Sequence, residues 1–231
     1  GTDLIFLREL TGGIYFGKRG RLDNGNTAYD TCVYSREEIV RLVKMGFELA
    51  EKRSKKLCCV DKANVLESSR LWRETVQSME KDHPNVSVSY EFVDAVAMRL
   101  IQWPKNYDVL VTENLFGDIL TDEASVITGS MGLMPSASVG NENSLYEPIH
   151  GSFPQAAKKN IANPLATILS AAMMFEMSFG LKNESDLIKT TVDKSLKNEI
   201  VTEDLSGKKG RSFSTSEVGD FLVKEILSNK I

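Results

Sequence analysis

The chain has 231 residues, of which 42% are hydrophobic and 26% charged, and its formal net charge is −4. These values are typical of a soluble globular protein with one large or two small domains. The negative charge argues against a nucleic-acid partner, and no apolar run is long enough to span a membrane. The three cysteines, two of them adjacent, argue against a disulfide framework and favour the reducing cytoplasm.

Strands and helices alternate through the first half of the chain, which predicts an α/β fold with a largely open sheet. Short apolar runs predict strands over residues 3–7, 57–60, 86–92 and 108–112. Asn24-Gly25 predicts a hairpin turn within 18–27, and a capping box at Ser35 and Glu38 predicts a helix that follows it. Further helices are expected over residues 68–81, from 94 to the proline at 104, and from 115 onwards with Asn114 as N-cap.

The composition changes after residue 125, where a domain boundary is expected, giving domains 1–125 and 126–231. Residues 128–140 hold three glycines and three serines and are predicted to be a loop, and residues 146–152 form a second polar loop after a short strand. Asn163 and Pro164 predict the start of a core helix that continues to about residue 179, with Asn as N-cap and Pro at the first helical position. Two amphipathic helices are expected near 185–199 and 216–228.

Asp118 and Asp122 lie four residues apart on the helix expected after strand 108–112. Two like charges at this spacing destabilise an exposed helix by roughly 0.2–0.5 kcal/mol. The pair is therefore either a solvated acidic face or a cation site, and a carboxylate-only set favours Mg²⁺ or Mn²⁺ over Zn²⁺. Open α/β sheets bind ligands beyond the carboxyl ends of their strands, which is where this helix begins.

Polar side chains stand at several other strand ends, where they could converge on one crevice: Arg8, Asp61, Lys62, Asp94 and Glu113. Lys62 is either an exposed lysine or, with a depressed pKa, a proton carrier, and Arg8 either holds a carboxylate or makes a structural ion pair. Asp94 either joins a metal site or caps its own helix.

Two further residues carry open alternatives. Tyr15, after the Gly12-Gly13 pair, either donates a proton or packs, and His150 with Gly151 and Ser152 is either a nucleotide loop or structural. Neither a G-x-G-x-x-G nor a Walker A motif is present, so neither standard nucleotide-binding loop is supported.

Five segments in order closely resemble the 3-isopropylmalate dehydrogenases of leucine biosynthesis, within the β-decarboxylating dehydrogenases. They are RELTGGIYFG at 8–17, VDKANVLE at 60–67, TENLFGDILTDEAS at 112–125, EPIHGS at 147–152 and IANPLATILSAAMM at 161–174. The leucine-type LTGGIYFG segment argues against the isocitrate, tartrate and homoisocitrate relatives. The resemblance covers essentially the whole chain but leaves the family's N-terminal third without a counterpart. Because the chain starts at Gly1 with a strand almost at once, we expect it to be a piece of a longer protein.

The resemblance implies a two-domain α/β fold with helices on both sides of an open sheet, a cytoplasmic homodimer, and no membrane partner. The activity it implies is the metal- and NAD-dependent oxidative decarboxylation of (2R,3S)-3-isopropylmalate to 4-methyl-2-oxopentanoate and CO₂. Domain 1–125 would bind substrate and metal and form the dimer, and 126–231 would be part of the NAD-binding domain. The alternatives are a D-malate or tartrate-type dehydrogenase, or an inactive dimerising or nucleotide-binding module.

The resemblance also implies roles for single residues. Tyr15 and Lys62 would be catalytic, the substrate would contact Arg8, Val65 and Asp94, and Mg²⁺ or Mn²⁺ would bind Asp94, Asp118 and Asp122. NAD would be bound by Asn64, Glu147, His150, Gly151, Ser152, Gln155 and Asn163. Lys62 and one metal-binding aspartate would reach across a dimer interface, and hairpin 18–27 resembles the family's intersubunit arm. Two positions depart from the family pattern: Gln155 replaces an aspartate, which leaves NAD against NADP selectivity open beside Lys158 and Lys159, and Ala95 replaces an asparagine.

Overall fold

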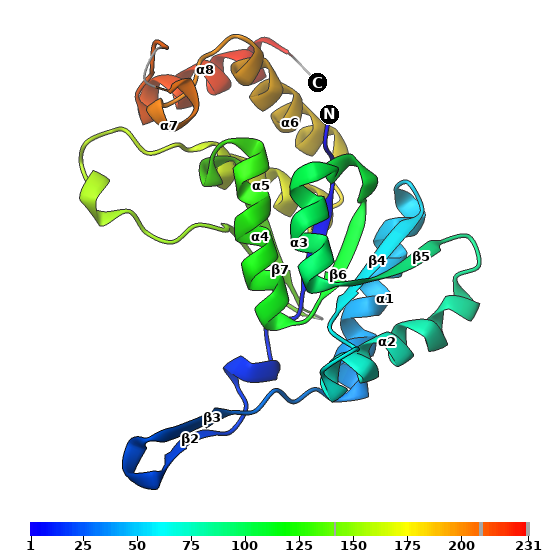
Figure 1. Ribbon diagram of the computed structural model, residues 1–231. Coiled ribbons are helices and arrows are strands. Elements are labelled where there is room, and N and C mark those ends of the chain that lie inside the picture. The colour runs from blue at the N-terminus through cyan, green and yellow to red at the C-terminus, as the bar shows by residue number, and fades with distance from the viewer. Residues whose placement is uncertain (141, 208–209, 230–231) are drawn as a thin grey trace. The chain divides into compact units, whose positions relative to one another are not determined.

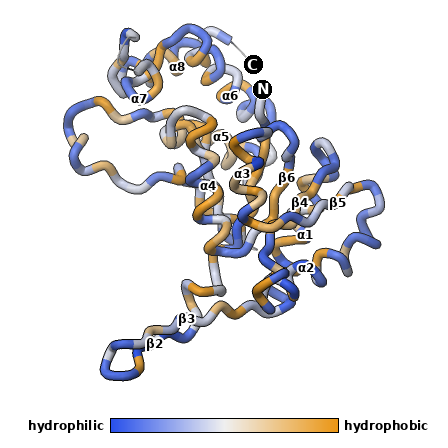
Figure 2. The backbone as a smooth tube through the Cα atoms, viewed as in Figure 1, coloured by the Kyte–Doolittle hydropathy of each residue, from blue (hydrophilic) through white to orange (hydrophobic). Residues whose placement is uncertain are grey.

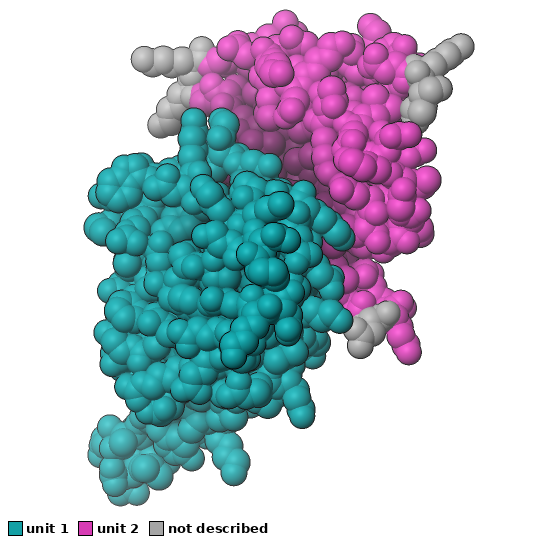
Figure 3. All heavy atoms as spheres, turned by 90° about the vertical axis from the view of Figure 1, so that its right-hand side faces the viewer, with its two compact units in different colours: residues 1–124 teal, residues 125–231 magenta. Residues whose placement is uncertain are grey.

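The protein is seen in a computed structural model that describes residues 1–140, 142–207 and 210–229. The chain forms two compact units, Gly1–Ala124 and Ser125–Ile231 (Figure 3). Each unit has its own layers and is described by itself.

A four-stranded parallel sheet organises the first unit (Figure 1). Its order is β1-β6-β4-β5, with the strands Ile5–Arg8, Val109–Thr112, Lys56–Asp61 and Ser87–Phe92. The inner strand β6 is buried at every residue and apolar over most of its length (Figure 2), as a strand covered on both faces requires. The parallel order brings all four carboxyl ends to one edge, which confirms the predicted α/β fold with an open sheet.

Helices cover both faces of this sheet. Helices α1 (Arg36–Lys52) and α2 (Glu67–Met79) pack on one face, and α3 (Val93–Gln102) packs against β4 and β5. Side chains alternate along a strand, so Leu57 and Cys59 join the α1–α2 core while Cys58 points to the other face. Both cysteines are buried free thiols that act as small apolar residues.

Local capping signals place α1 as predicted. The Ser35 side chain accepts a hydrogen bond from the Glu38 backbone, and the Glu38 carboxylate accepts one from the Ser35 backbone. Ile39, Val43, Phe47 and Ala50 of this helix are fully buried.

A hairpin extends away from the sheet (Figure 1). It pairs β2 (Arg19–Leu22) with β3 (Thr27–Asp30), and the turn between them contains Asn24 in the left-handed region at φ 53°. The predicted turn at Asn24-Gly25 is confirmed. All four residues of β3 are exposed, so the hairpin is not stabilised by the core of its own unit.

The N-cap predicted for α4 (Asn114–Thr128) is wrong. Glu113 caps this helix instead, because its Oε1 accepts a hydrogen bond of 2.6 Å from the Phe116 N–H. Asn114 is the first residue of the helix, and its side-chain amide bonds to Arg8 and to loop carbonyls. The Asn114 side chain therefore bonds to residues that are distant in the sequence instead of capping its own helix.

The second unit packs helices on an antiparallel strand pair. Strands β7 (Pro135–Val139) and β8 (Ser144–Pro148) both contact α5 (Leu165–Met177), and α6 (Lys182–Lys197), α7 (Glu203–Ser206) and α8 (Thr215–Ser228) complete the unit. The predicted loop over 128–140 is therefore partly wrong, because pairing with β8 makes 135–139 a strand. Helix α5 begins one residue later than predicted, at Leu165. Among the described residues, no helix is both long and apolar enough to cross a membrane.

Candidate active site

Three of the predicted site residues meet at the carboxyl edge of the sheet. Arg8 ends β1 beside Thr112 of β6, so its guanidinium reaches the first turns of α4. Nη1 of Arg8 lies 2.7 Å from Oδ1 of Asp118, and the Tyr15 hydroxyl donates to Oδ2 of Asp118 at 3.0 Å. The Arg8 guanidinium also lies 5.8 Å from the centre of the Tyr15 ring. This group of Arg8, Tyr15 and Asp118 is called the Arg8 cluster below.

A glycine permits the close approach of Arg8 to α4. A Cβ added at Gly117 would lie 2.6 Å from Cγ of Arg8 and 2.4 Å from Oγ1 of Thr112. Any side chain at this position would push the arginine away from the helix. Gly117 therefore positions the charged group rather than marking a helix end.

Tyr15 and Arg8 of the Arg8 cluster keep groups that could act on a substrate, in addition to the bonds that they make to each other's neighbours. The bond to Asp118 raises the pKa of the Tyr15 hydroxyl above its ordinary value, because the carboxylate disfavours a phenolate, so this side chain is a proton donor at neutral pH. Among residues 1–140, 142–207 and 210–229, three of the five N–H groups of Arg8 have partners, which are Asn114 and Asp118. The other two could bind a carboxylate.

The loop that carries Tyr15 requires its two glycines. Gly12 and Gly13 have φ angles of 89° and 66°, which side chains disfavour. A Cβ at Gly13 would lie 2.1 Å from the hydroxyl oxygen of Tyr34. That hydroxyl donates to Oε2 of Glu113 at 2.8 Å, so the loop packs on a buried polar group next to the start of α4.

Lys62 and Asp94 form a second pair at the same edge. They follow β4 and β5, which are neighbours in the sheet, and Nζ of Lys62 bonds to Oδ1 of Asp94. The bond from Lys62 holds the pKa of the Asp94 carboxyl below its usual value. Asp94 lies in the first turn of α3, where its carboxylate bonds to Lys62 and also accepts a hydrogen bond from its own backbone N–H, so neither of its two predicted roles is excluded.

Two polar strand ends do not join any crevice. Asp61 is fully buried, and its carboxylate accepts hydrogen bonds of 2.8 and 3.0 Å from Arg73 of α2. Glu113 is also buried, and its carboxylate accepts hydrogen bonds from the Tyr34 hydroxyl and from the N-terminus of α4. These two residues are therefore not among the polar strand ends that come together, because each is bonded to a structural partner.

The predicted metal ligands occupy two places within one chain. Asp118 and the exposed Asp122 are one turn apart on α4, whereas Asp94 pairs with Lys62 on the other side of β4. Over the described ranges, no three acidic, histidine or cysteine side chains are grouped closely enough to hold a metal ion. The donors themselves are carboxylates, which fit Mg²⁺ or Mn²⁺. A complete carboxylate set therefore needs a further donor from outside this group.

One predicted cofactor residue, Asn64, and one predicted substrate residue, Val65, lie beside Lys62. Asn64 and Val65 are exposed in the turn after β4, where the N–H of Val65 donates to the Lys62 carbonyl at 2.9 Å. Both side chains are available to a ligand at this edge.

The remaining predicted cofactor residues lie in the second unit, along an exposed loop. Glu147 is on β8, and Gly151, Ser152 and Gln155 are exposed beyond it. Nδ1 of His150 lies 3.0 Å from the Gly151 carbonyl oxygen, so Nδ1 must carry a proton and Nε2 is left for another partner.

Asn163 has partners within its own unit. Its Oδ1 accepts from the Leu165 N–H at 3.0 Å, and its Nδ2 donates to Oδ2 of Asp204 at 2.9 Å. Burial alone would raise the pKa of Asp204, but hydrogen bonds from Ser130, Thr202 and Asn163 hold it below its usual value. One N–H of the Asn163 amide remains for a ligand.

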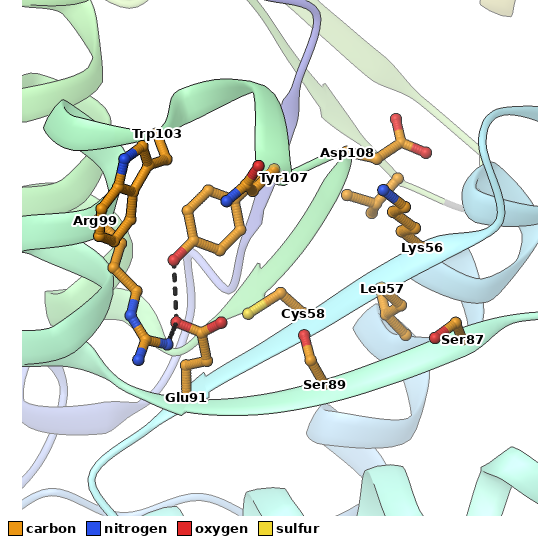
Figure 4. Close-up of a pocket in the computed structure, with 12 residues that line it drawn as sticks. Lys56, Leu57, Cys58, Ser87, Ser89, Glu91, Arg99, Trp103, Tyr107 and Asp108 are labelled. Carbon is orange, nitrogen blue, oxygen red and sulfur yellow. Dashed lines mark hydrogen bonds and ion pairs between the residues drawn. The ribbon is translucent and has the colours of Figure 1, made fainter.

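A separate hollow of about 440 Å³ lies on the sheet face beside α3 and contains none of the predicted site residues (Figure 4). Its charged centre is already paired, because Glu91 accepts from Tyr107 at 2.9 Å and from Arg99 at 2.8 Å. Burial raises the pKa of the Cys58 thiol there to about 12, so this thiol is not nucleophilic at neutral pH.

Comparison with known proteins gives the family. The model of the isocitrate/isopropylmalate dehydrogenase family matches residues 1–222. The chain is 53% identical to a 3-isopropylmalate dehydrogenase of Desulfitobacterium hafniense over 95% of its length, and 55% identical to one of Bacteroides fragilis over 98%. It spans 62% and 63% of the length of these two relatives.

Solved structures agree with this fold. The isocitrate dehydrogenase of Methylococcus capsulatus matches 97% of this chain, and 67% of its own length is covered, with a TM-score of 0.91 and 33% identity. A β-decarboxylating dehydrogenase of Thermococcus kodakarensis in its apo form matches 96% of this chain and 64% of its own, with a TM-score of 0.84 and 34% identity. The chain belongs to the isocitrate/isopropylmalate dehydrogenase family.

Proposed function

We propose that the complete protein oxidises and decarboxylates (2R,3S)-3-isopropylmalate, with NAD⁺ and Mg²⁺ or Mn²⁺, to 4-methyl-2-oxopentanoate and CO₂. The observation that carries this proposal is the Arg8 cluster, which joins a cation, a proton donor and a carboxylate at the carboxyl edge of the sheet. Relatives with 53% and 55% identity are named 3-isopropylmalate dehydrogenases, which supports the choice of substrate.

The roles of the residues follow from the chemistry. Lys62 takes the hydroxyl proton as the carbon-bound hydrogen leaves as hydride to NAD⁺, which produces a ketone β to a carboxylate. The carboxylate then leaves as CO₂, and Tyr15 delivers a proton to the enolate carbon. The two unassigned N–H groups of Arg8 hold a substrate carboxylate, and Val65 offers an exposed apolar surface to the isopropyl group.

Asp118 and Asp122, together with Asp94 of a second copy, would hold Mg²⁺ or Mn²⁺. The metal would supply positive charge that stabilises negative charge on the substrate oxygen. Asp118 already orients Arg8 and Tyr15, so its carboxylate also fixes the geometry of the groups around the substrate.

A homodimer is part of this proposal. Within one chain Lys62 and Asp94 bond to each other rather than to the Arg8 cluster, so a second copy would bring the two halves together. Three apolar side chains on α3 and α4 support an interface, because more than half of each is exposed: Met98 at 54%, Ile101 at 62% and Ile119 at 55%. The unit 1–124 would thus bind substrate and metal and form the dimer.

The second unit would contribute to the NAD site through Glu147, His150, Gly151, Ser152, Gln155 and Asn163. Gln155 can donate to a ribose hydroxyl but carries no charge to repel a 2′-phosphate. The activity assay described next should therefore compare the rates of reduction of NAD⁺ and NADP⁺.

The test is a steady-state assay of the complete gene product with 3-isopropylmalate or D-malate, Mn²⁺ and either dinucleotide. A higher kcat/KM for 3-isopropylmalate is expected, together with loss of activity when the metal is chelated. A preference for D-malate would assign the alternative dehydrogenase class. No reduction of either dinucleotide with either substrate would leave the protein as a dimerising or nucleotide-binding module.

A further inference from the structure

Asn114 bonds directly to Arg8 of the Arg8 cluster, although the chemistry above gives it no role. It is the first residue of α4 and is only 2% exposed. Its backbone N–H donates to the Tyr34 hydroxyl at 2.9 Å. Its backbone is therefore fixed by the first turn of the helix and by the hydroxyl of a buried tyrosine.

The two ends of the Asn114 amide serve different neighbours. Oδ1 accepts from Nε and Nη2 of Arg8 at 3.1 and 2.9 Å, and the Asn114 carbonyl accepts from Nε at 3.0 Å. Nδ2 donates to the carbonyls of Leu10 and Gly12 at 3.2 and 3.4 Å. One amide thus joins the arginine to the loop that carries Tyr15.

We propose that Asn114 is a positioning residue for the reaction, with separate tasks for its oxygen and its nitrogen. The oxygen holds the Nε–Nη2 edge of Arg8, so that the unassigned N–H groups face a substrate carboxylate. The nitrogen holds the loop before Tyr15 and so sets where its hydroxyl lies. This role rests on the proposed function.

The amide chemistry makes the two tasks separable. An aspartate at position 114 has the same shape and still accepts from Arg8, but it has no hydrogen to donate when ionised and would place charge against the carbonyls of Leu10 and Gly12. An alanine removes both sets of bonds. A residue with a purely structural role would affect stability in both variants without this division.

The experiment compares Asn114→Ala and Asn114→Asp in the complete protein, with Asn85→Ala as control. Asn85 is exposed, and its side chain makes no hydrogen bond among the described residues. Asn114→Ala is expected to raise the KM for 3-isopropylmalate about 10- to 100-fold and to lower kcat. Asn114→Asp is expected to keep KM within about threefold of wild type but to leave kcat low. Equal changes in KM for the two Asn114 variants would overturn the proposal. If Asn114→Ala does not fold, a KM for Asn114→Asp beyond that limit would overturn it as well.

A second readout does not depend on activity. The Nη2–H that Arg8 donates to Oδ1 of Asn114, assigned by the ¹H–¹⁵N signal that disappears in Arg8→Lys, should be protected from exchange in wild type and in Asn114→Asp. It should exchange rapidly in Asn114→Ala, and an unchanged signal there would refute the positioning of Arg8. If the wild-type protein does not turn over 3-isopropylmalate but the exchange of this signal is as expected, the proposed substrate is wrong and the positioning of Arg8 by Asn114 is supported.

Discussion

Replacing Asp61 by alanine tests the buried ion pair that fixes the turn after Lys62. The Asp61 carboxylate is fully buried and accepts two bonds from Arg73 and one of 2.9 Å from the Ala63 N–H. Removal of one partner of a buried pair costs about 3–5 kcal/mol. The Arg73 side chain is 28% exposed and can regain part of its hydration, so we expect the free energy of unfolding to fall by about 3 kcal/mol.

Urea unfolding followed by Trp72 fluorescence measures this loss, since Trp72 is buried next to Arg73 on α2. Glu67→Ala is the matched control, because Glu67 pairs with Arg70 on the same helix but is 83% exposed, and its loss should cost less than about 1 kcal/mol. The double variant Asp61→Leu/Arg73→Met should be less harmful than Asp61→Ala, since it leaves no unpaired charge. Equal losses for Asp61→Ala and Glu67→Ala would refute the reasoning.

Three further predictions concern single groups. Gly13→Ala should destabilise the protein by more than about 1 kcal/mol in a thermal unfolding assay, because the added Cβ would lie 2.1 Å from the Tyr34 hydroxyl oxygen. Gly219→Ala is the control, because an added Cβ meets nothing on helix α8, and it should stabilise the protein by about 0.5–1 kcal/mol. Burial alone would raise the pKa of Asp108, but its hydrogen bonds lower it. The Asp108 carboxylate therefore stabilises the fold at pH values above its pKa in the unfolded chain, about 3.9, and this stabilisation is lost as pH falls through its lower pKa in the folded chain. In Asp108→Asn, the free energy of unfolding should consequently fall less steeply as the pH is lowered. Tyr15→Phe should lower kcat roughly 10²- to 10⁴-fold with little change in KM, and an unchanged kcat would exclude Tyr15 as the proton donor.

Local patterns predicted the parts of the fold that depend on neighbouring residues. The capping box at Ser35, the turn at Asn24 and the alternation of strands and helices all act over a few positions, and each is confirmed. The parallel order of the strands also explains why Arg8 and Lys62 lie at one edge.

Partners that are distant in sequence explain what the patterns missed. Asn114 has a strong capping preference, but Arg8, from 106 residues earlier in the chain, takes its side chain instead. Asp61 was expected at the crevice, and its burial depends on which face of α2 carries Arg73. Strand β7 reads Pro-Ser-Ala-Ser-Val, and the serine, glycine and proline content of the segment around it favoured a loop over its short alternating pattern. Its pairing with β8 identifies it as a strand.

The most direct test of a site shared by two chains mixes two inactive variants of the complete protein, Lys62→Met and Asp118→Asn. If Lys62 of one copy serves the Arg8 cluster of the other, each mixed dimer holds one site with both native residues. Random mixing in equal amounts should then restore about a quarter of the wild-type activity on 3-isopropylmalate. If both residues of a site came from one chain, every mixed dimer would carry two damaged sites, and the absence of any recovery would contradict the shared site.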